Sequence, residues 1–293
     1  MKLSTCPLCQ NDTLSALFLF QGTLVVRCGG CGLVMLNPQP NDEALATIYG
    51  DQYFIGSDHD ALRDHGNALK RGTAKLQLAE ISTYMDASQP LRMLEVGCGL
   101  GNFLVEAQQM RFEVQGIDVS PSAVATANAT LGAVCVRSGQ LETAGFDVAS
   151  FDIIVLADVI EHVRDPKAFM RHVRTLIKPG GALFVAVPSL DSLSARLMGR
   201  HWMEYKHEHL FYFNRQTIQR LITDCGFEDL TVTPGKKVLS LGYIIGHFEK
   251  FPVPILTPLM KVVGWILPES TLAAPLRVVA SGINVMARAP KDE

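Results

Sequence analysis

Between residues 91 and 187 the sequence alternates between short apolar runs and segments with helical periodicity. The apolar runs have the length of strands, and the helical segments between them are long enough to carry the chain back to the start of a neighbouring strand. This alternation is typical of a parallel sheet with helices on both faces. The expected strands are 91–97, 114–119, 133–137, 151–157 and 182–187, and the expected helices are 101–111, 121–131 and 166–177. The sequence therefore predicts an α/β fold with a doubly wound sheet.

Two further apolar runs extend this sheet toward the C-terminus. Residues 227–233 are expected to form a sixth strand, and residues 283–289 a final strand that runs antiparallel. The insertion between them, at about 238–275, is apolar, broken by prolines and compatible with helices. It can cover a substrate pocket, form a homodimer contact or lie on a membrane surface, and the first two are the default interpretations.

Four cysteines near the N-terminus form two CxxC pairs, Cys6 with Cys9 and Cys28 with Cys31, with 18 residues between the pairs. This spacing is typical of a structural zinc site, in which each CxxC turn presents two thiolates to one Zn²⁺ ion. Apolar runs at 14–20 and 23–27 predict a hairpin between the pairs. Four thiolates leave no open coordination position, which disfavours a catalytic zinc, and two unrelated redox motifs are the alternative.

Composition and charge limit the class of protein further. The seven cysteines are an odd number, which favours reduced thiols and a cytoplasmic location. We expect no secretory signal and no transmembrane segment. The net charge of −3 opposes binding to nucleic acid. We expect a zinc module at 1–40, a helical linker at 41–90 with helices at 42–49 and 61–84 around a loop at 51–60, and a main domain at 91–293.

A glycine-rich turn follows the first expected strand and contains Glu95, Gly97, Cys98, Gly99 and Gly101. Glycines at this place let the backbone approach a ligand closely at the mouth of the sheet. The dinucleotide-binding pattern GxGxxG is not met, because its last position falls on Asn102. The turn therefore predicts a cofactor site that offers less room for a pyrophosphate.

The second expected strand ends at Asp118, 21 residues beyond Gly97. A carboxylate at that strand end can accept hydrogen bonds from both hydroxyls of a ribose. Ser120 and Pro121 then supply the N-cap and the first residue of the next helix. The alternative is that Asp118 is a helix-capping acid without a ligand.

These motifs give the chain a resemblance to class I S-adenosylmethionine (SAM)-dependent methyltransferases. The matching segments are 95–101, 116–120, 151–155, 158–166 and 178–183. The resemblance implies a Rossmann-like sheet of seven strands, SAM as cofactor, and a cofactor-covering role for region 41–90. It implies that the glycine turn binds the methionine part of SAM, that Asp118 binds the ribose, and that Gln140 and Leu141 flank the adenine. The implied cofactor contacts are Glu95, Gly97, Cys98, Gly99, Gly101, Asp118, Val119, Gln140, Leu141, Ala157 and Asp158.

The chain also resembles a subgroup of these methyltransferases that carries an N-terminal four-cysteine zinc ribbon. The shared motifs are Cys28 to Leu33, Asn37-Pro38-x-Pro40, the stretch 49–53, and the segment 209–213 that leads through Thr217 to Gly226-Phe227. Some members methylate carbon on nucleotide-linked deoxysugars, and others act on natural-product or cell-surface intermediates. The resemblance implies a small-molecule acceptor, methylated on oxygen or carbon.

Methyl transfer is an in-line displacement, so the protein must orient two reactants, and a hydroxyl or acidic C–H acceptor also needs a base. Residues 201–209 contain three histidines, two acids and a tyrosine, and imidazole suits proton transfer near neutral pH. In the sugar C-methyltransferases the matching Tyr, Glu and His lie over the substrate. The candidates here are Tyr205, His207, Glu208 and His209. His207 is favoured as the base and His209 follows it, although the His209 ring can equally pack beneath the aromatic residues 211–213.

The neighbouring sequence bears on the acceptor and on alternative functions. Glu161 and His162, after the fourth strand, are interpreted as structural, and a second zinc at the histidines lacks a clear ligand set.

Residues 162–220 contain ten Lys and Arg against four Asp and Glu, which favours an anionic acceptor, although a solvated helix face explains part of this excess. An RNA methyltransferase is a second hypothesis, and its ribbon would offer only Lys2 and Arg27 as cations. A non-catalytic cofactor-binding scaffold is a third.

Overall fold

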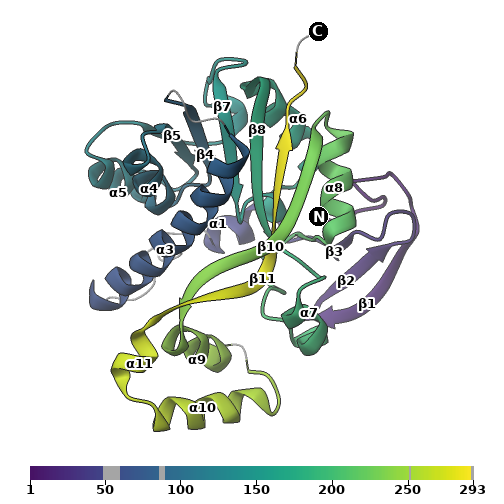
Figure 1. Ribbon diagram of the computed structural model, residues 1–293. Coiled ribbons are helices and arrows are strands. Elements are labelled where there is room, and N and C mark those ends of the chain that lie inside the picture. The colour runs from purple at the N-terminus through teal and green to yellow at the C-terminus, as the bar shows by residue number, and fades with distance from the viewer. Residues whose placement is uncertain (49–59, 86–89, 251, 292–293) are drawn as a thin grey trace.

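The computed structural model describes residues 1–48, 60–85, 90–250 and 252–291. Its main sheet has seven strands in the order β10-β11-β8-β7-β4-β5-β6 (Figure 1). They are β4 (Arg92–Val96), β5 (Glu113–Asp118), β6 (Val136–Ser138), β7 (Phe151–Ala157), β8 (Ile177–Pro188), β10 (Glu228–Ser240) and β11 (Pro275–Arg288). The neighbours from β8 to β6 run parallel, whereas β11 runs antiparallel to both β8 and β10. The predicted α/β sheet of seven strands is confirmed.

Successive residues of the central strand β7 point to opposite faces of the sheet, which explains why this strand is apolar along most of its length. Ile153 and Val155 pack in a core that includes residues of α3 and α4, and Ile154 and Leu156 pack in a second core with residues of α6 and α8. The helices are α3 (Asp60–Tyr84), α4 (Asn102–Gln109), α5 (Pro121–Leu131), α6 (Pro166–Leu176), α7 (Leu193–Met198) and α8 (Arg215–Asp224). Both faces of the sheet are therefore covered, as the pattern predicted.

Capping residues fix where the helices begin after the strands. The Ser120 side chain accepts a hydrogen bond from the backbone N–H of Ala123, and Asp165 accepts one from Ala168. A proline follows each cap at the first helical position, where its missing N–H costs nothing. The loops between the strand ends and these helices are thus held in defined conformations at one edge of the sheet.

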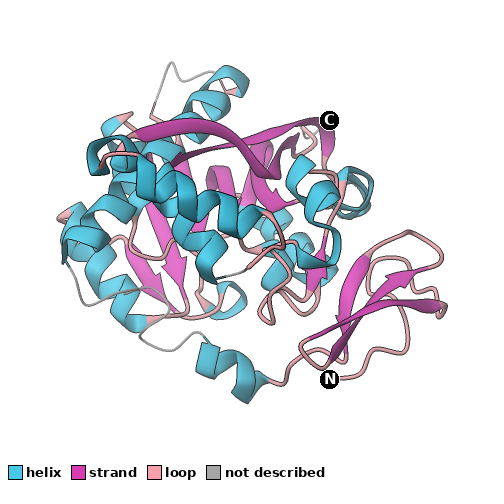
Figure 2. Ribbon diagram, turned by 90° about the horizontal axis from the view of Figure 1, so that it is seen from below, coloured by secondary structure: helices cyan, strands magenta, loops and turns pink. Residues whose placement is uncertain are grey.

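A second, four-stranded sheet lies beside the main body near the N-terminus (Figure 2). Its strands are β1 (Leu14–Phe20), β2 (Thr23–Cys28), β3 (Val34–Asn37) and β9 (Phe211–Tyr212), and α1 (Asp42–Ile48) follows β3. The hairpin predicted between the cysteine pairs is present, with Phe20 opposite Thr23. The fourth strand was not predicted, because a two-residue strand from a segment far along the chain has no local pattern. The loop expected at 51–60 lies, apart from Asp60, outside the described residues.

The last two strands are longer than the sequence predicted. Beyond the sheet, β10 and β11 continue as a two-stranded ribbon down to the pair Ser240 and Pro275. The ribbon carries α9 (Leu241–Lys250), α10 (Leu256–Ile266) and α11 (Glu269–Ala273), which form the lower end of the molecule in Figure 1. The described part of the insertion is thus helical between its two strand ends. Among the described residues, no helix has the length and apolar character needed to cross a membrane.

Candidate functional site

The glycine turn between β4 and α4 has backbone conformations that side chains disfavour. Gly97, Gly99 and Gly101 all have positive φ angles, of 70°, 51° and 77°. A Cβ atom on Gly97 would lie 2.7 Å from Cγ2 of Val159, which belongs to the loop after β7. The turn is therefore packed directly against the end of the neighbouring strand, and a side chain at Gly97 would separate them.

Asp118 holds this turn in place from the end of β5. One carboxylate oxygen accepts a hydrogen bond from the Gly99 N–H at 2.8 Å, and the other accepts one from the Ser120 N–H at 2.9 Å. Burial raises the pKa of Asp118, and the hydrogen bonds from Ser120 and Gly99 oppose that shift. A carboxylate has about four acceptor positions, more than these backbone groups use, so Asp118 can also accept from a hydroxyl group of a ligand.

Glu95, at the end of β4, is a buried acid close to Asp118. Its Oε2 atom has no hydrogen-bond partner among the described residues. Burial, and then the negative charge of Asp118, raise the pKa of Glu95 well above its ordinary value. A buried, unsatisfied carboxyl is costly unless a ligand or a water completes its hydrogen bonding. The residues of the turn therefore fit a cofactor that brings a cationic or hydrogen-bond-donating group to this place.

The segment expected to flank an adenine lies next to Asp118. The Gly139 N–H donates a hydrogen bond to the backbone oxygen of Asp118 at 2.9 Å, which brings Gln140 and Leu141 to the end of β5. Gln140 is exposed there, as is Val119, whereas Leu141 is buried. Cys98 is also buried, so its contribution to a ligand site would come from its backbone.

Asp158 follows Ala157 at the end of β7 and has a positive φ of 55°, which is unusual for a residue with a side chain. Its Oδ2 atom lies 3.2 Å from Nζ of Lys237 on β10. The charge of Asp158 is the main reason why the pKa of Lys237 is raised. Sequence reasoning missed Lys237, because no motif surrounds it and its partner lies 79 residues earlier.

Beside this ion pair, two histidine rings pack edge to face. The ring centres of His162 and His209 are 4.7 Å apart. His162 Nδ1 bonds the backbone oxygen of Glu208 at 2.9 Å, and His209 Nδ1 bonds that of Glu204 at 2.8 Å. Because a carbonyl can only accept, Nδ1 carries the proton in both rings, and Nε2 is the basic nitrogen of each neutral ring. Burial is the first cause that lowers the pKa of both histidines, so both are neutral at neutral pH.

Glu161 completes this cluster. It is 1% exposed, and neither of its carboxyl oxygens has a hydrogen-bond partner among the described residues. Its carboxyl oxygen and one ring nitrogen each of His162 and His209 lie within 4.8 Å of one another. Burial and then Asp158 raise the pKa of Glu161 well above its ordinary value. The loop after β7 is thus richer in buried titratable groups than its sequence indicated.

Glu204 and Lys206 form a second ion pair near the histidines. Lys206 Nζ lies 3.0 Å from Glu204 Oε2, and Ser281 donates to Glu204 Oε1 at 2.8 Å. Burial alone would raise the pKa of Glu204, but the charges of Lys206 and Lys237 lower it to about 2. The carboxylate is therefore ionised throughout the range in which a histidine titrates.

The structure separates the four sequence-predicted catalytic residues into two places. His209 and the backbone of Glu208 lie against His162, beside the loop after β7. Tyr205 is instead buried among aromatic rings, with Phe18 at 4.9 Å and Tyr212 at 4.7 Å between ring centres, and burial raises its pKa to about 12. His207 Nε2 lies 3.0 Å from the side-chain oxygen of Gln21, in the turn between β1 and β2.

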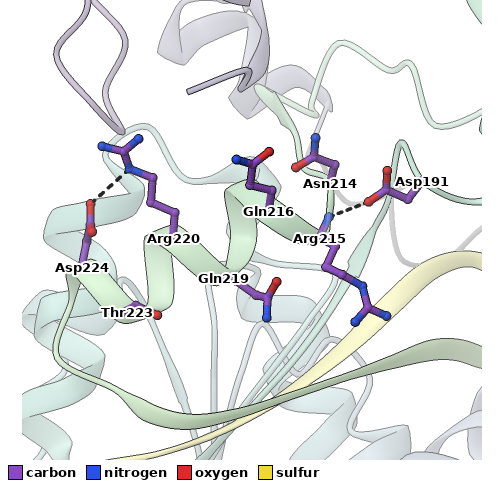
Figure 3. A pocket seen from close by; sticks show the side chains of 8 residues that line it. All are labelled: Asp191, Asn214, Arg215, Gln216, Gln219, Arg220, Thr223 and Asp224. Carbon is purple, nitrogen blue, oxygen red and sulfur yellow. Dashed lines mark hydrogen bonds and ion pairs between the residues drawn. The ribbon is translucent and has the colours of Figure 1, made fainter. Parts of the chain in front are cut away.

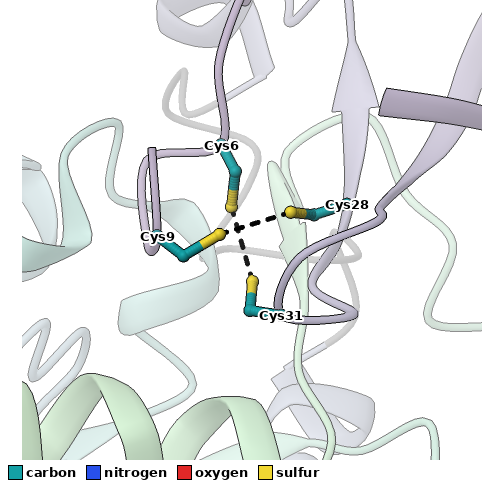
Figure 4. A group of neighbouring side chains, drawn as sticks. All are labelled: Cys6, Cys9, Cys28 and Cys31. Atoms are coloured by element: carbon teal, nitrogen blue, oxygen red, sulfur yellow. Dashed lines mark hydrogen bonds between the residues drawn. The ribbon is translucent and has the colours of Figure 1, made fainter. Parts of the chain in front are cut away.

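The four cysteine sulfurs of the N-terminal sheet converge on one point (Figure 4). The Sγ atoms of Cys6 and Cys31 are 3.6 Å apart and those of Cys9 and Cys28 are 3.4 Å apart. These distances are too long for disulfides and near the roughly 3.8 Å edge of a ZnS₄ tetrahedron with Zn–S bonds of about 2.3 Å. The cysteines are free thiols, so the donor set fits a tetrahedral zinc ion.

Two surface hollows lie away from the glycine turn. One, of about 590 Å³, lies over α8 and is lined by polar side chains such as Gln216, Arg220 and Asp224 (Figure 3). The other, of about 350 Å³, lies between the β1–β2 turn and the residues after α7. Its lining combines the rings of Phe20, Trp202 and Tyr205 with the cations Arg200 and Lys250.

Sequence comparison identifies the class of protein. A family model described as a methyltransferase domain matches residues 68–232, more than half of the chain, and the chain belongs to this family. Among curated proteins, a ubiquinone biosynthesis O-methyltransferase from Caulobacter vibrioides is 35% identical over 122 residues, which cover 39% of this chain and 47% of that protein. The enzyme of the same name from Cereibacter sphaeroides is 28% identical over 121 residues, 39% of this chain and 49% of that protein. The chain thus spans about half the length of these relatives.

Solved structures show the same fold. Phosphoethanolamine N-methyltransferase 2 of Haemonchus contortus, solved with phosphomonomethylethanolamine and S-adenosylhomocysteine, is 16% identical, with a TM-score of 0.53 over 88% of this chain and 63% of that one. A SAM-dependent methyltransferase of Archaeoglobus fulgidus is 15% identical, with a TM-score of 0.51 over 84% of this chain and all of that one. The seven-stranded sheet is accordingly the Rossmann-like sheet of class I SAM-dependent methyltransferases.

Proposed function

We propose that this chain transfers the methyl group of SAM to a small-molecule acceptor, on oxygen or carbon. The observation that carries the proposal is that the loop after β7 contacts both halves of such a site. Its Val159 packs against Gly97 of the cofactor turn, and its His162 packs against His209. Bound SAM supplies an electrophilic methyl group, and a neutral imidazole lies beside the same loop.

In this scheme the residues of the chain bind the cofactor and orient the acceptor toward its methyl group. Asp118 accepts the ribose hydroxyls with the lone pairs that Gly99 and Ser120 leave open. Glu95 meets the polar end of the cofactor at the glycine turn. Holding the acceptor and the methyl group at reactive distance accounts for much of the rate, up to about 7–11 kcal/mol of the barrier.

We propose His209 rather than His207 as the base, which reverses the order favoured by the sequence. His209 lies at the cofactor side of the segment, and the Glu204 backbone oxygen orients its ring so that Nε2 accepts the proton. His207 bonds Gln21 of the N-terminal sheet, away from the loop after β7. Glu208 then holds the His162 ring through its backbone oxygen, and Tyr205 stabilises the segment through its packing with neighbouring aromatic rings.

The acceptor in this proposal is anionic. Residues 162–220 contain ten Lys and Arg against four Asp and Glu, and Lys206 and Lys237 lie near the histidine cluster. Cations beside the base suit an acceptor that carries a phosphate or a carboxylate. The name of the curated relatives, ubiquinone biosynthesis O-methyltransferase, supports a small organic acceptor methylated on oxygen.

We further propose that Cys6, Cys9, Cys28 and Cys31 bind a structural zinc ion, which places the chain in the zinc-ribbon subgroup. Residues 1–40 form the ribbon, 41–90 the helical linker that covers the cofactor, and 91–293 the methyltransferase domain. The convergence of four free thiols supports the zinc site, and α3 supports the covering role because Asn67 bonds Asn102 at the start of α4.

The test measures SAM binding by calorimetry and then S-adenosylhomocysteine release with sets of anionic phenols, sugar nucleotides and short RNAs. The proposal predicts tight SAM binding and product release with a small molecule. SAM binding without turnover on any set would favour the scaffold, and turnover on RNA alone would replace the acceptor class.

A further inference from the structure

Helix α10 lies at the far end of the β10–β11 ribbon and presents a row of apolar side chains to solvent. Its inner side packs on α9, where Gly264 lies against Ile245. Its outer side carries four exposed apolar residues spaced as one helical face, Leu259, Val262, Trp265 and Ile266. Ile255, just before the first residue of the helix, extends this row. No residue of α10 is buried, although the helix is almost entirely apolar.

The exposure of this row is extreme for side chains of this size. Trp265 is 88% exposed and Ile255 is 83% exposed. Single exposed apolar residues are ordinary on protein surfaces, but a contiguous row of them marks a contact site. Helix α10 lies at the lower end of the molecule in Figure 1, so the occupant of the row must accept a projecting helix.

The charges around the row select the kind of occupant. Between Lys250 and Glu269 the sequence has Lys261 as its one charged residue, and acids stand just outside, at Glu249 and Glu269. A short helix that is apolar on its outer side, with a tryptophan near one end and an exposed lysine, Lys261, suits the boundary between lipid headgroups and acyl chains. The ammonium group of Lys261 is complementary to anionic headgroups.

From this placement we propose that the outer face of α10 docks on the surface of an anionic phospholipid bilayer. The row of five apolar residues enters the headgroup boundary, and Lys261 of the same helix lies among the phosphates. This inference goes beyond the proposed methyl transfer and does not rest on it, because binding to vesicles is measured without turnover.

The chain contains a convenient pair of reporters for this proposal. Its two tryptophans are Trp202, which is 2% exposed, and Trp265, which is 88% exposed. Insertion of α10 moves Trp265 from water into an apolar layer and leaves Trp202 in its core. A blue shift of tryptophan emission on adding vesicles therefore reports on α10, and W265F should lose the shift while still binding.

The experiment sediments the full-length protein with vesicles of phosphatidylcholine alone or of equal parts phosphatidylcholine and phosphatidylglycerol. We expect binding to the mixed vesicles, weaker binding to the neutral ones, and a loss of about tenfold or more in affinity for Val262→Glu. Val134→Glu is the matched control, because Val134 is 95% exposed outside the row. Unchanged SAM affinity of Val262→Glu shows that the variant is folded.

Three results would overturn the proposal. The first is a wild-type protein that fails to sediment with either vesicle. The second is equal loss of binding in Val134→Glu and Val262→Glu. The third is a protein that does not bind lipid but forms a dimer in solution, which Val262→Glu dissociates. The occupant of the row would then be a second copy of the chain.

Discussion

The carboxylate of Asp118 and the backbone N–H of Gly99 are joined by a 2.8 Å hydrogen bond between neighbouring strand ends. This bond fixes the cofactor turn before any ligand arrives, so the turn does not have to be ordered on binding. In the proposed site Asp118 thus has two tasks: it holds the backbone N–H groups of Gly99 and Ser120, and it binds the ribose of the cofactor.

Replacing Asp118 should therefore weaken SAM binding strongly. In Asp118→Asn an amide group faces the N–H groups of Gly99 and Ser120, and we expect an affinity loss of about 10- to 100-fold. Asp118→Ala should bind no better. Calorimetric titration with SAM measures both, and Asp147→Asn, an exposed acid in a nearby loop, is the control. Wild-type affinity in both Asp118 variants would contradict the cofactor site.

His209→Gln should lower kcat by about 100- to 10,000-fold and leave SAM affinity unchanged, because the variant loses the basic nitrogen. Burial lowers the pKa of His209, so activity should be flat around pH 7 and fall only below the usual histidine range. The matched variant His207→Gln should retain most activity. A larger loss in His207→Gln than in His209→Gln would restore His207 as the base.

Glu204 should make stability depend on pH in the acid range. Its pKa is 4.5 ordinarily and about 2 in the folded protein, so its contribution is complete above pH 4.5 and lost as pH falls toward 2. The contribution is on the order of 3 kcal/mol. Urea unfolding between pH 6 and pH 3 should show a steeper decline for wild type than for Glu204→Gln. The same decline in stability for both proteins would show that the Glu204–Lys206 ion pair is not the cause. Glu142→Gln, which replaces an exposed acid, is the control and should match wild type.

Gly97→Ala should destabilise the protein for two separable reasons, positive φ and contact with Val159. Gly132 has a similar φ of 67° but nothing within 4 Å of an added Cβ, so Gly132→Ala measures the backbone part alone, about 1–2 kcal/mol. Gly97→Ala should cost more, and Val159→Ala should recover the difference. Equal melting temperatures for the two glycine variants would show that the turn can move away from Val159.

Removal of the proposed zinc ion should loosen the N-terminal sheet and the segment that follows His209. Strand β3 pairs with β9, and the Leu36 N–H donates to the Leu210 oxygen at 3.1 Å. We expect a strong chelator, or Cys31→Ser, to lower the melting temperature and kcat while SAM affinity stays near wild type. Cys135→Ser, at a cysteine outside the cluster, should change neither. Full turnover in a metal-free protein would show that the folded N-terminal sheet is not needed to position the segment around His209.

The sequence predicted the parts of the site that depend on local spacing. The glycine turn, the acid at the end of β5 and the capped helix after it each follow from local backbone rules. The regular spacing of the cysteine pairs likewise predicted that the four sulfurs lie together, as they do in the structure. The hairpin between them was also predicted, since Gln21-Gly22 separates two apolar runs.

The parts that failed to show in the sequence depend on contacts between distant segments. Lys237 meets Asp158 only because β10 crosses the sheet edge, and no pattern around Lys237 indicates that. His207 and His209 are two residues apart and look alike in sequence, yet one faces Gln21 and the other His162. The two rings differ in direction because β9, which follows the histidines, pairs with β3 and so fixes the course of the chain there.

Strand β10 has one more consequence, which is mechanical. It is a single extended segment that carries Lys237 at the sheet edge and ends at Ser240, where α9 begins. From Lys236 to Ser240 the strand pairs with β11 without a register shift, and paired extended chain bends less readily than a loop. We therefore expect a tilt of α9 to α11 to shift the Lys237 ammonium and, with it, the ion pair to Asp158.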